Sequence, residues 1–178
     1  MVAAFNFSPK GTFQFFYSYG AADRTATGSF TVVGDTVKLK SDKVPGKDFT
    51  VISQSKSGAG YTLQFKSPNK VLLQHIRCIF FNGSKRVEEM TDADGKVQLS
   101  LPVCDTIFVQ YAVFPDIVTL IKDKANNNNL FIIELNPSLE QVSFKGIDFI
   151  IEDDETLSCL TNYFMQVEEI KFKLQIKN

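Results

Sequence analysis

The sequence contains no tryptophan, one histidine and three cysteines, and these shortages exclude several kinds of site. With His75 alone, no site that needs two imidazoles can form within the chain. Cys78, Cys104 and Cys159 lie far apart and show no Cys-x-x-Cys or Cys/His spacing, which argues against a zinc site. At most one internal disulfide is possible, and we expect free, buried thiols because cysteine is among the most buried residue types.

A large charge of one sign is also missing. The 19 Lys and Arg against 20 Asp and Glu leave a formal net charge of -1. This balance argues against nucleic acid or an anionic membrane surface as the main partner, since clustered Lys and Arg hold both. No apolar run approaches the ~20 residues of a membrane-spanning helix, so no transmembrane segment is expected.

Signals for targeting and for cofactors are likewise missing. There is no Gly-rich phosphate loop and no Gly-x-Ser-x-Gly elbow, and we predict no cofactor. The start of the sequence, Met1 to Phe5, has no basic stretch followed by an apolar core. We expect a periplasmic or cell-envelope location if a signal upstream of Met1 has been removed, and a cytoplasmic location otherwise.

What the sequence does have is aromatic residues in strict alternation. Seventeen Phe and five Tyr with only six Pro favour strands over helices. Period-two patterns run through residues 12–19, 96–101, 106–113 and 170–177, so that alternate side chains share a face. The sequence therefore predicts an all-β fold, a mostly antiparallel sandwich or meander with the possibility of two packed sub-domains.

The break at Ser67-Pro68-Asn69-Lys70 is the predicted boundary. It separates a β-meander over residues 1–67 from a β-sandwich over residues 71–178, and the two can also form one continuous domain. The long apolar run 71–81 predicts a strand covered on both faces for part of its length. If the fold contains a short helix, we expect it over residues 157–166.

Two stretches resemble known families. Thr91-Asp92-Ala93-Asp94-Gly95, followed by the strand 97–101, Pro102 and a strand ending near Tyr111, resembles carboxypeptidase-regulatory-like and transthyretin-like modules, which are small β-sandwiches common in envelope proteins of Bacteroidetes-type bacteria. Residues 11–39, from Gly11-Thr12-Phe13 to the Gly34-Asp35 turn, are similar to the opening hairpins of lipocalin-like bacterial domains of unknown function. These resemblances imply an envelope protein with a lipocalin-like first part and a sandwich second part.

Tyr17, Tyr19, Asp23 and Arg24 are the candidate ligand-binding residues. In a lipocalin-like setting they would line the mouth of a cleft, with Arg24 pairing an anionic group of a ligand. The alternative is an Asp-Arg pair that holds a surface loop. The aromatic face formed by Phe13, Phe15, Tyr17 and Tyr19 is more typical of a core than of a pocket.

Acidic residues and the histidine supply the remaining candidates. Asp92 and Asp94 are weak calcium candidates, because the residues that follow lack the glycine and glutamate of the calcium-loop template, and a β-turn role is the alternative. The acidic residues 152–155 could add oxygen ligands or form a solvated loop. His75 is interpreted as a structural residue, and no catalytic residue is assigned. Asn82-Gly83-Ser84 has glycosylation spacing but also suits a hairpin turn.

Three functions follow. The first is a non-enzymatic binding or protein-interaction module of a bacterial cell envelope, whose partner is a protein or a small ligand. The second is a lipocalin-like carrier of a small apolar or anionic ligand. The third is a hydrolase that uses His75 or an acidic pair, which requires a concave site with a perturbed imidazole or carboxyl group.

Overall fold

The computed structural model describes residues 2–20, 22–113 and 115–175, and the chain divides into two compact units. Unit 2 is the continuous segment Gly46–Leu139. Unit 1 consists of Met1–Pro45 and Glu140–Asn178, so unit 2 is an insertion within unit 1. These boundaries differ from the expected division at residues 67–71, because the strands just before that break pair with strands that follow it.

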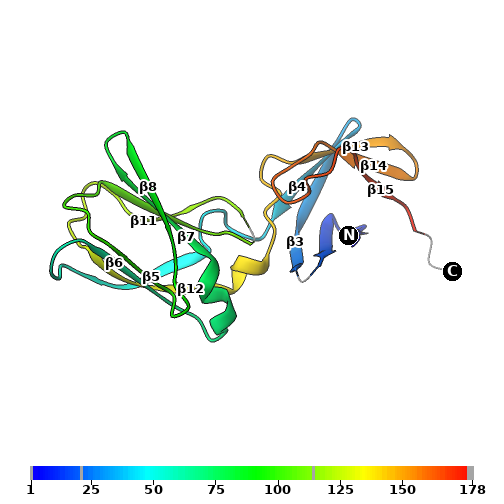
Figure 1. The fold of residues 1–178 in the computed structure, drawn as a ribbon. Helices are drawn as coiled ribbons and strands as arrows, with labels where there is room; N and C mark the ends of the chain where they lie inside the picture. The colour runs from blue at the N-terminus through cyan, green and yellow to red at the C-terminus, as the bar shows by residue number, and fades with distance from the viewer. Residues whose placement is uncertain (1, 21, 114, 176–178) are drawn as a thin grey trace. The chain divides into compact units, whose positions relative to one another are not determined.

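Unit 1 is a seven-stranded sheet in which every neighbouring pair is antiparallel. Several of its strands are labelled in Figure 1. Its strands, in sheet order, are β1 (Val2–Ser8), β2 (Thr12–Tyr19), β3 (Ala22–Val33), β4 (Thr36–Ser41), β13 (Asp148–Asp153), β14 (Thr156–Cys159) and β15 (Ile170–Lys173). The sheet therefore joins both ends of the described chain and leaves β1 and β15 as its two edges.

The core of unit 1 is built from aromatic rings. On β2, Phe13, Phe15 and Tyr17 are buried, whereas the alternate residue Phe16 is 42% exposed. The expected core-facing aromatic face is thus confirmed for three residues, but Tyr19 at its end is exposed. Successive side chains of a strand point to opposite faces, which explains this sorting.

The two ends of the seven-stranded sheet face each other. The ring of Phe5 on β1 lies 5.2 Å from that of Phe149 on β13 and 5.0 Å from that of Phe172 on β15. Phe144, in the loop before β13, is fully buried and contacts the rings of both Phe5 and Phe15. Aromatic side chains therefore fill the space that the curled sheet encloses.

Unit 2 is a sandwich of two four-stranded sheets (Figure 1). One sheet has the order β11 (Thr119–Lys122), β10 (Thr106–Tyr111), β7 (Ile76–Asn82) and β8 (Lys85–Met90). The other has the order β5 (Phe49–Ser55), β12 (Leu130–Leu135), β6 (Tyr61–Lys66) and β9 (Lys96–Leu99). The rings of Tyr61 and Phe80 meet between the sheets at 6.5 Å. β12 and β6 pair in parallel, and the other pairs are antiparallel. The all-β, mostly antiparallel fold class is confirmed.

One local expectation is confirmed only in part, and another is wrong. The apolar run 71–81 begins as a 3-10 helix, η1 (Lys70–His75), because the side chain of Asn69 accepts a hydrogen bond from the N–H of Val71 and caps it. The expected helix over 157–166 is absent: β14 occupies its start, and the Asn162 side chain then accepts bonds from the N–H groups of Phe164 and Met165. Such asparagine bonds favour turns over helix. A short 3-10 helix, η2 (Pro137–Glu140), was not expected.

The three cysteines are free. Cys78 and Cys104 are buried, as expected, and Cys159 is half-buried. Burial raises the pKa of all three thiols, to about 11 for Cys159. None is therefore an activated nucleophile at neutral pH.

Candidate functional site

The four candidate ligand-binding residues lie in paired strands, not in a loop. Arg24 on β3 is opposite Tyr17 on β2, and Asp23 is opposite Ser18. Arg24 is buried, and its guanidinium donates a 2.8 Å hydrogen bond to the carbonyl oxygen of Gln141. Asp23 is exposed on the other face of β3. The structure thus brings Tyr17 and Arg24 together but separates Asp23 from both.

Tyr17 and Arg24 belong to the polar end of the unit 1 core. Burial is the main reason that the pKa of the Tyr17 phenol is raised, Tyr19 adds to the rise, and the positive charge of Arg24 opposes it. The ammonium group of Lys43 donates a 2.9 Å bond to the same Gln141 carbonyl oxygen that Arg24 contacts. These bonds attach the segment after η2 to the β3 region, which is a structural role. A ligand-binding role for Tyr17, Tyr19, Asp23 and Arg24 remains a prediction.

Asp92 has a defined turn role. Its carboxylate oxygen Oδ1 accepts bonds from the N–H groups of Asp94 (3.0 Å) and Lys96 (2.8 Å). Its carbonyl oxygen accepts a bond from the N–H of Gly95, which has a positive φ of 72°. This is the β-turn alternative considered for the pair. Within the described residues, no three His, Cys, Asp or Glu side chains gather as metal ligands would.

His75 lies at the end of η1 with its side chain exposed. Its ring meets the ring of Tyr111 edge-on at 6.4 Å, and its carbonyl oxygen accepts a bond from the N–H of Ala112. Strand β7 begins immediately after His75. These contacts describe a residue that helps to position the start of a strand.

Unit 1 has a groove of about 1520 Å³ that is lined by both edge strands of its sheet. We call it the edge groove. Half-buried apolar side chains line it, among them Phe5, Phe7, Ile151, Leu157 and Phe172. Charged side chains also line it, namely Asp153, Asp154, Glu155, Glu169, Lys171 and Lys173. With four carboxylates and two ammonium groups, its lining carries a formal charge of about -2 at neutral pH.

The edge strand β1 is regular and uncharged. It reads Val-Ala-Ala-Phe-Asn-Phe-Ser, and it pairs with β2 residue by residue without a bulge. In an antiparallel pair, alternate residues direct their N–H and C=O groups away from the partner strand. β1 thus presents a row of backbone donors and acceptors without the charges, proline or bulges that usually protect an edge.

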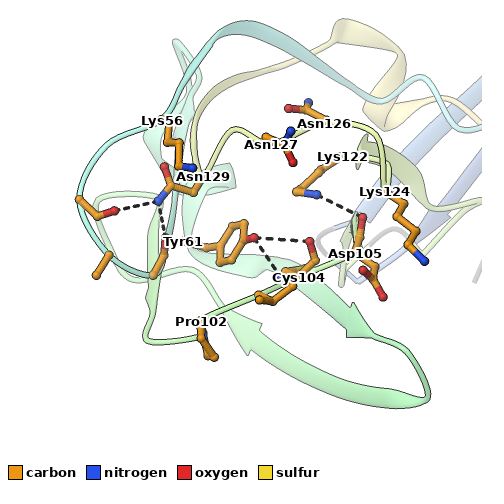
Figure 2. A pocket seen from close by; sticks show the side chains of 14 residues that line it. Lys56, Tyr61, Pro102, Cys104, Asp105, Lys122, Lys124, Asn126, Asn127 and Asn129 are labelled. Atoms are coloured by element: carbon orange, nitrogen blue, oxygen red, sulfur yellow. Dashed lines mark hydrogen bonds between the residues drawn. The ribbon is translucent and has the colours of Figure 1, made fainter.

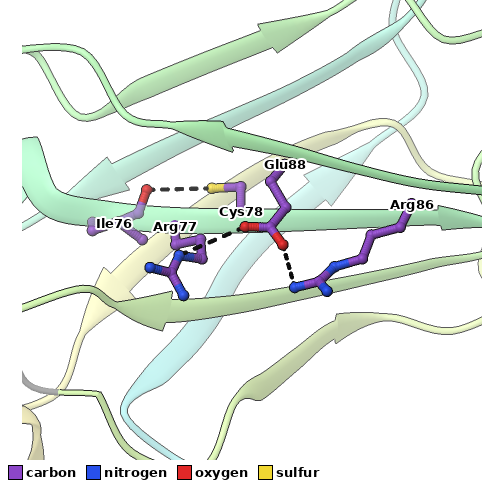
Figure 3. A network of polar contacts seen from close by, with 5 residues as sticks. All are labelled: Ile76, Arg77, Cys78, Arg86 and Glu88. Atoms are coloured by element: carbon purple, nitrogen blue, oxygen red, sulfur yellow. Dashed lines mark hydrogen bonds and ion pairs between the residues drawn. The ribbon is translucent and has the colours of Figure 1, made fainter.

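Two other edge strands, β8 and β15, carry ion pairs. On edge strand β8, Glu88 forms ion pairs with Arg86 on the same strand and with Arg77 on β7 (Figure 3). On β15, Lys171 forms ion pairs with Glu169 at 2.8 Å and with Glu152 at 3.1 Å. These exposed pairs add little stability. The pair on β8 places charge where a strand of another molecule would pair, whereas Glu152 lies on β13, on the side of β15 away from its free edge. β1 has no comparable protection.

The hairpin turn between β13 and β14 gives one end of the edge groove its negative charge. Hydrogen bonds, first from the Ser158 side chain and then from Lys171, lower the pKa of Glu152. The N–H of Glu155 donates a 2.8 Å bond to Asp153, and this bond is the main cause of the lowered pKa of Asp153. Both carboxylates therefore remain ionised well below neutral pH.

Unit 2 has a smaller, basic pocket of about 430 Å³ (Figure 2). Its charged lining residues are Lys56, Lys122, Lys124 and Asp105. Lys122 is 3% exposed, and its ammonium group donates bonds to the carbonyl oxygens of Asp105 (3.2 Å) and Asp123 (3.0 Å). Three lysines against one aspartate make this pocket electropositive. We call it the lysine pocket.

Buried polar contacts shape the lysine pocket. The side chain of Asn129 donates bonds to the carbonyl oxygens of Ser57, Gly58 and Gly60 and accepts one from the N–H of Ser57. The Tyr61 hydroxyl accepts a 3.0 Å bond from the N–H of Cys104 (Figure 2). These bonds fix the two loops on which the pocket is built.

Sequence reasoning missed both hollows. Lys56 is distant in sequence from Lys122 and Lys124, so no local motif reveals the lysine pocket. The uncharged run in β1 is visible in the sequence, but only the pairing order shows that it is an edge.

No family model, curated protein or solved structure matches the chain. None of the helices found in residues 2–20, 22–113 and 115–175 is long and apolar enough to cross a membrane.

Proposed function

We propose that this chain is a non-enzymatic binding and protein-interaction module whose recognition site is the edge groove. The observation that carries this proposal is the free, regular and uncharged edge of β1 beside a groove lined by apolar side chains. At about 1520 Å³ the groove exceeds the ~300–1,000 Å³ typical of small-molecule pockets, which favours a larger partner.

The proposal includes a bacterial cell-envelope location. Its support is the resemblance of residues 87–113 and 11–39 to modules found in such proteins, together with a unit 1 sheet that curls as a lipocalin-like sheet would. Fractionation of cells that express the natural gene tests the location. Recovery of the protein from the cytoplasm would contradict it.

Paired substitutions on the unit 1 sheet test the recognition site. Ala4→Lys adds a charge to the exposed face of edge strand β1. Ile150→Lys adds the same charge to β13, which is already paired with a strand on each side, and so serves as the control. Extracts of the source cells are passed over immobilised wild-type and variant proteins. We expect a partner that wild type and Ile150→Lys retain and Ala4→Lys does not. Identical retention by all three proteins would refute the proposal.

The lysine pocket favours a second candidate function, a carrier of a small anionic ligand. Its positive charge and its volume of about 430 Å³ suit a phosphate-bearing or carboxylate-bearing molecule. Native mass spectrometry should then detect an anionic adduct that Lys124→Ala loses and that Lys66→Ala, at the opposite end of β6 from the pocket residue Tyr61, keeps. A purified protein without any adduct, and without binding of added phosphate or citrate, would exclude this candidate.

A further inference from the structure

We infer that the edge groove binds an extended segment of a partner protein as an eighth strand, antiparallel to both β1 and β15. The segment would be apolar at alternate positions and basic at its amino-terminal end. This inference rests on the proposed function, since it identifies the occupant of the same groove. It follows from strand direction, backbone hydrogen bonding and charge.

Strand direction is the first argument. Seven strands in an unbroken antiparallel order place the first and the last in the same direction, so β1 and β15 are parallel to each other. One further strand that runs opposite to both continues the antiparallel pattern on each side. A sheet of eight strands closes in this way, and its interior is just wide enough for side chains to fill. Aromatic rings already occupy part of that interior in unit 1, and the edge groove is the space that they leave beside β1 and β15.

Backbone hydrogen bonding is the second argument. β1 spans seven residues, which at ~3.4 Å per residue gives an edge about 24 Å long. Unpaired N–H and C=O groups along such an edge are a template for another strand, and main-chain bonds then provide affinity without dependence on sequence. The occupant is therefore expected to be an extended segment of about seven residues.

Side-chain chemistry specifies the segment further. Its inward side chains would meet Phe5, Leu157 and Phe172, which requires apolar residues at every second position. Lys173 at the end of β15 pairs with Thr156, and the N–H of Leu174 donates to the carbonyl oxygen of Glu155. An antiparallel strand thus begins beside the β13–β14 turn.

Charge at that turn selects the amino-terminal end of the segment. Asp153, Asp154 and Glu155 line the groove there, and Lys173 lies opposite Thr156 at the same turn, so these four groups carry a formal charge of about -2 at neutral pH. Basic residues at the start of the incoming strand would complement this charge. A strand of the opposite direction would bring its carboxyl-terminal end to the acidic turn.

A display library of random ten-residue peptides is the probe. Peptides are selected on wild-type protein, with counter-selection on Ala4→Lys and with Ile150→Lys as the matched control. We expect selected sequences that alternate apolar and polar residues after one or two basic residues. They should bind wild type and Ile150→Lys equally and Ala4→Lys about tenfold or more weakly. No enrichment over the Ala4→Lys background would overturn the inference.

N-methylation of the selected peptides tests strand pairing itself. Alternate residues of an inserted strand bond to β1 and to β15, so methylating either alternate set should weaken binding about tenfold or more. A loss from one set only would mean that the segment pairs with a single edge, which overturns closure by an eighth strand. No loss from either set would leave the edge groove as a binding site, and the proposed function intact, but would overturn strand addition.

A second copy of this chain is the competing occupant. Its uncharged β1 could pair antiparallel with β1 of the first copy. Sedimentation of wild-type protein and Ala4→Lys distinguishes this case. We expect wild type to remain monomeric at micromolar concentration, and a dimer that Ala4→Lys abolishes would replace the inferred partner by self-association.

Discussion

Replacing Phe144 by leucine should selectively destabilise unit 1. The Phe144 ring is fully buried, and its centroid lies 5.0 to 5.8 Å from those of Phe5, Phe13, Phe15, Phe149 and Phe164. Truncation of a buried Phe to Ala costs about 3–5 kcal/mol. Leucine refills part of the space but loses the ring contacts, so we expect a decrease of about 2 kcal/mol in the free energy of unfolding of unit 1.

Hydrogen exchange with mass spectrometry, read during thermal unfolding, can assign the loss to a unit. A domain of fewer than 100 residues loses about 4–8 °C of Tm per kcal/mol, so the unit 1 transition of Phe144→Leu should decrease by about 8–16 °C. Peptides from residues 46–139 should keep their protection. Phe16→Leu is the control, since Phe16 is 42% exposed on the same sheet, and it should change stability by less than about 0.5 kcal/mol. Equal effects of the two variants, or equal loss of protection in both units, would refute the assigned core.

Three further predictions concern other parts of the chain. Gly28→Ala forces a Cβ against the carbonyl oxygen of Lys40 and should lower the free energy of unfolding of unit 1, measured by urea denaturation, by about 3 kcal/mol or more. Ser29→Ala should change it by less than about 0.5 kcal/mol, and equal values for the two variants would contradict this close approach. The excised segment 46–139 should fold alone with the far-ultraviolet circular dichroism of a β protein and a cooperative transition, and a disordered fragment would contradict the division into units. Burial raises the pKa of Cys159 to about 11, so less thiolate is present at pH 8 than for an unperturbed thiol. Iodoacetamide should therefore alkylate Cys159 about a hundredfold more slowly than an unperturbed thiol, and the rate should increase as the pH approaches 11. Rapid alkylation of Cys159 at pH 8, measured by peptide mapping, would show that the thiol is not buried.

Local sequence patterns identified most of the strands. The alternation of Phe13, Phe15 and Tyr17, and that of Ile107, Val109 and Tyr111, matches the buried faces of β2 and β10. The same reasoning failed over residues 71–81, where a cap at Asn69 favours a 3-10 helix over continuation of the strand. An N-cap of this kind acts on the few residues that follow it, and there it can override the alternation of apolar residues that favours a strand.

The candidate site was less accessible to sequence reasoning. Tyr17, Tyr19, Asp23 and Arg24 are close in sequence, but the pleat of β3 separates Asp23 from Arg24. The edge groove and the lysine pocket are each formed by residues that are distant in sequence. Because these residues are close in sequence, we expected them to line the mouth of a cleft, but the structure places them on the paired strands β2 and β3.

The sequence by itself determined the all-β class and the inward or outward direction of most side chains, because a strand's period of two is a local property of the backbone. The tertiary structure alone decided that β4 pairs with β13 across the inserted unit 2, and that β1 and β15 are the free edges of one sheet. Any alternating strand can pair with many others. The choice among them depends on which rings pack together across the whole unit, as Phe5, Phe144 and Phe172 do here, and this packing is absent from any short stretch of sequence.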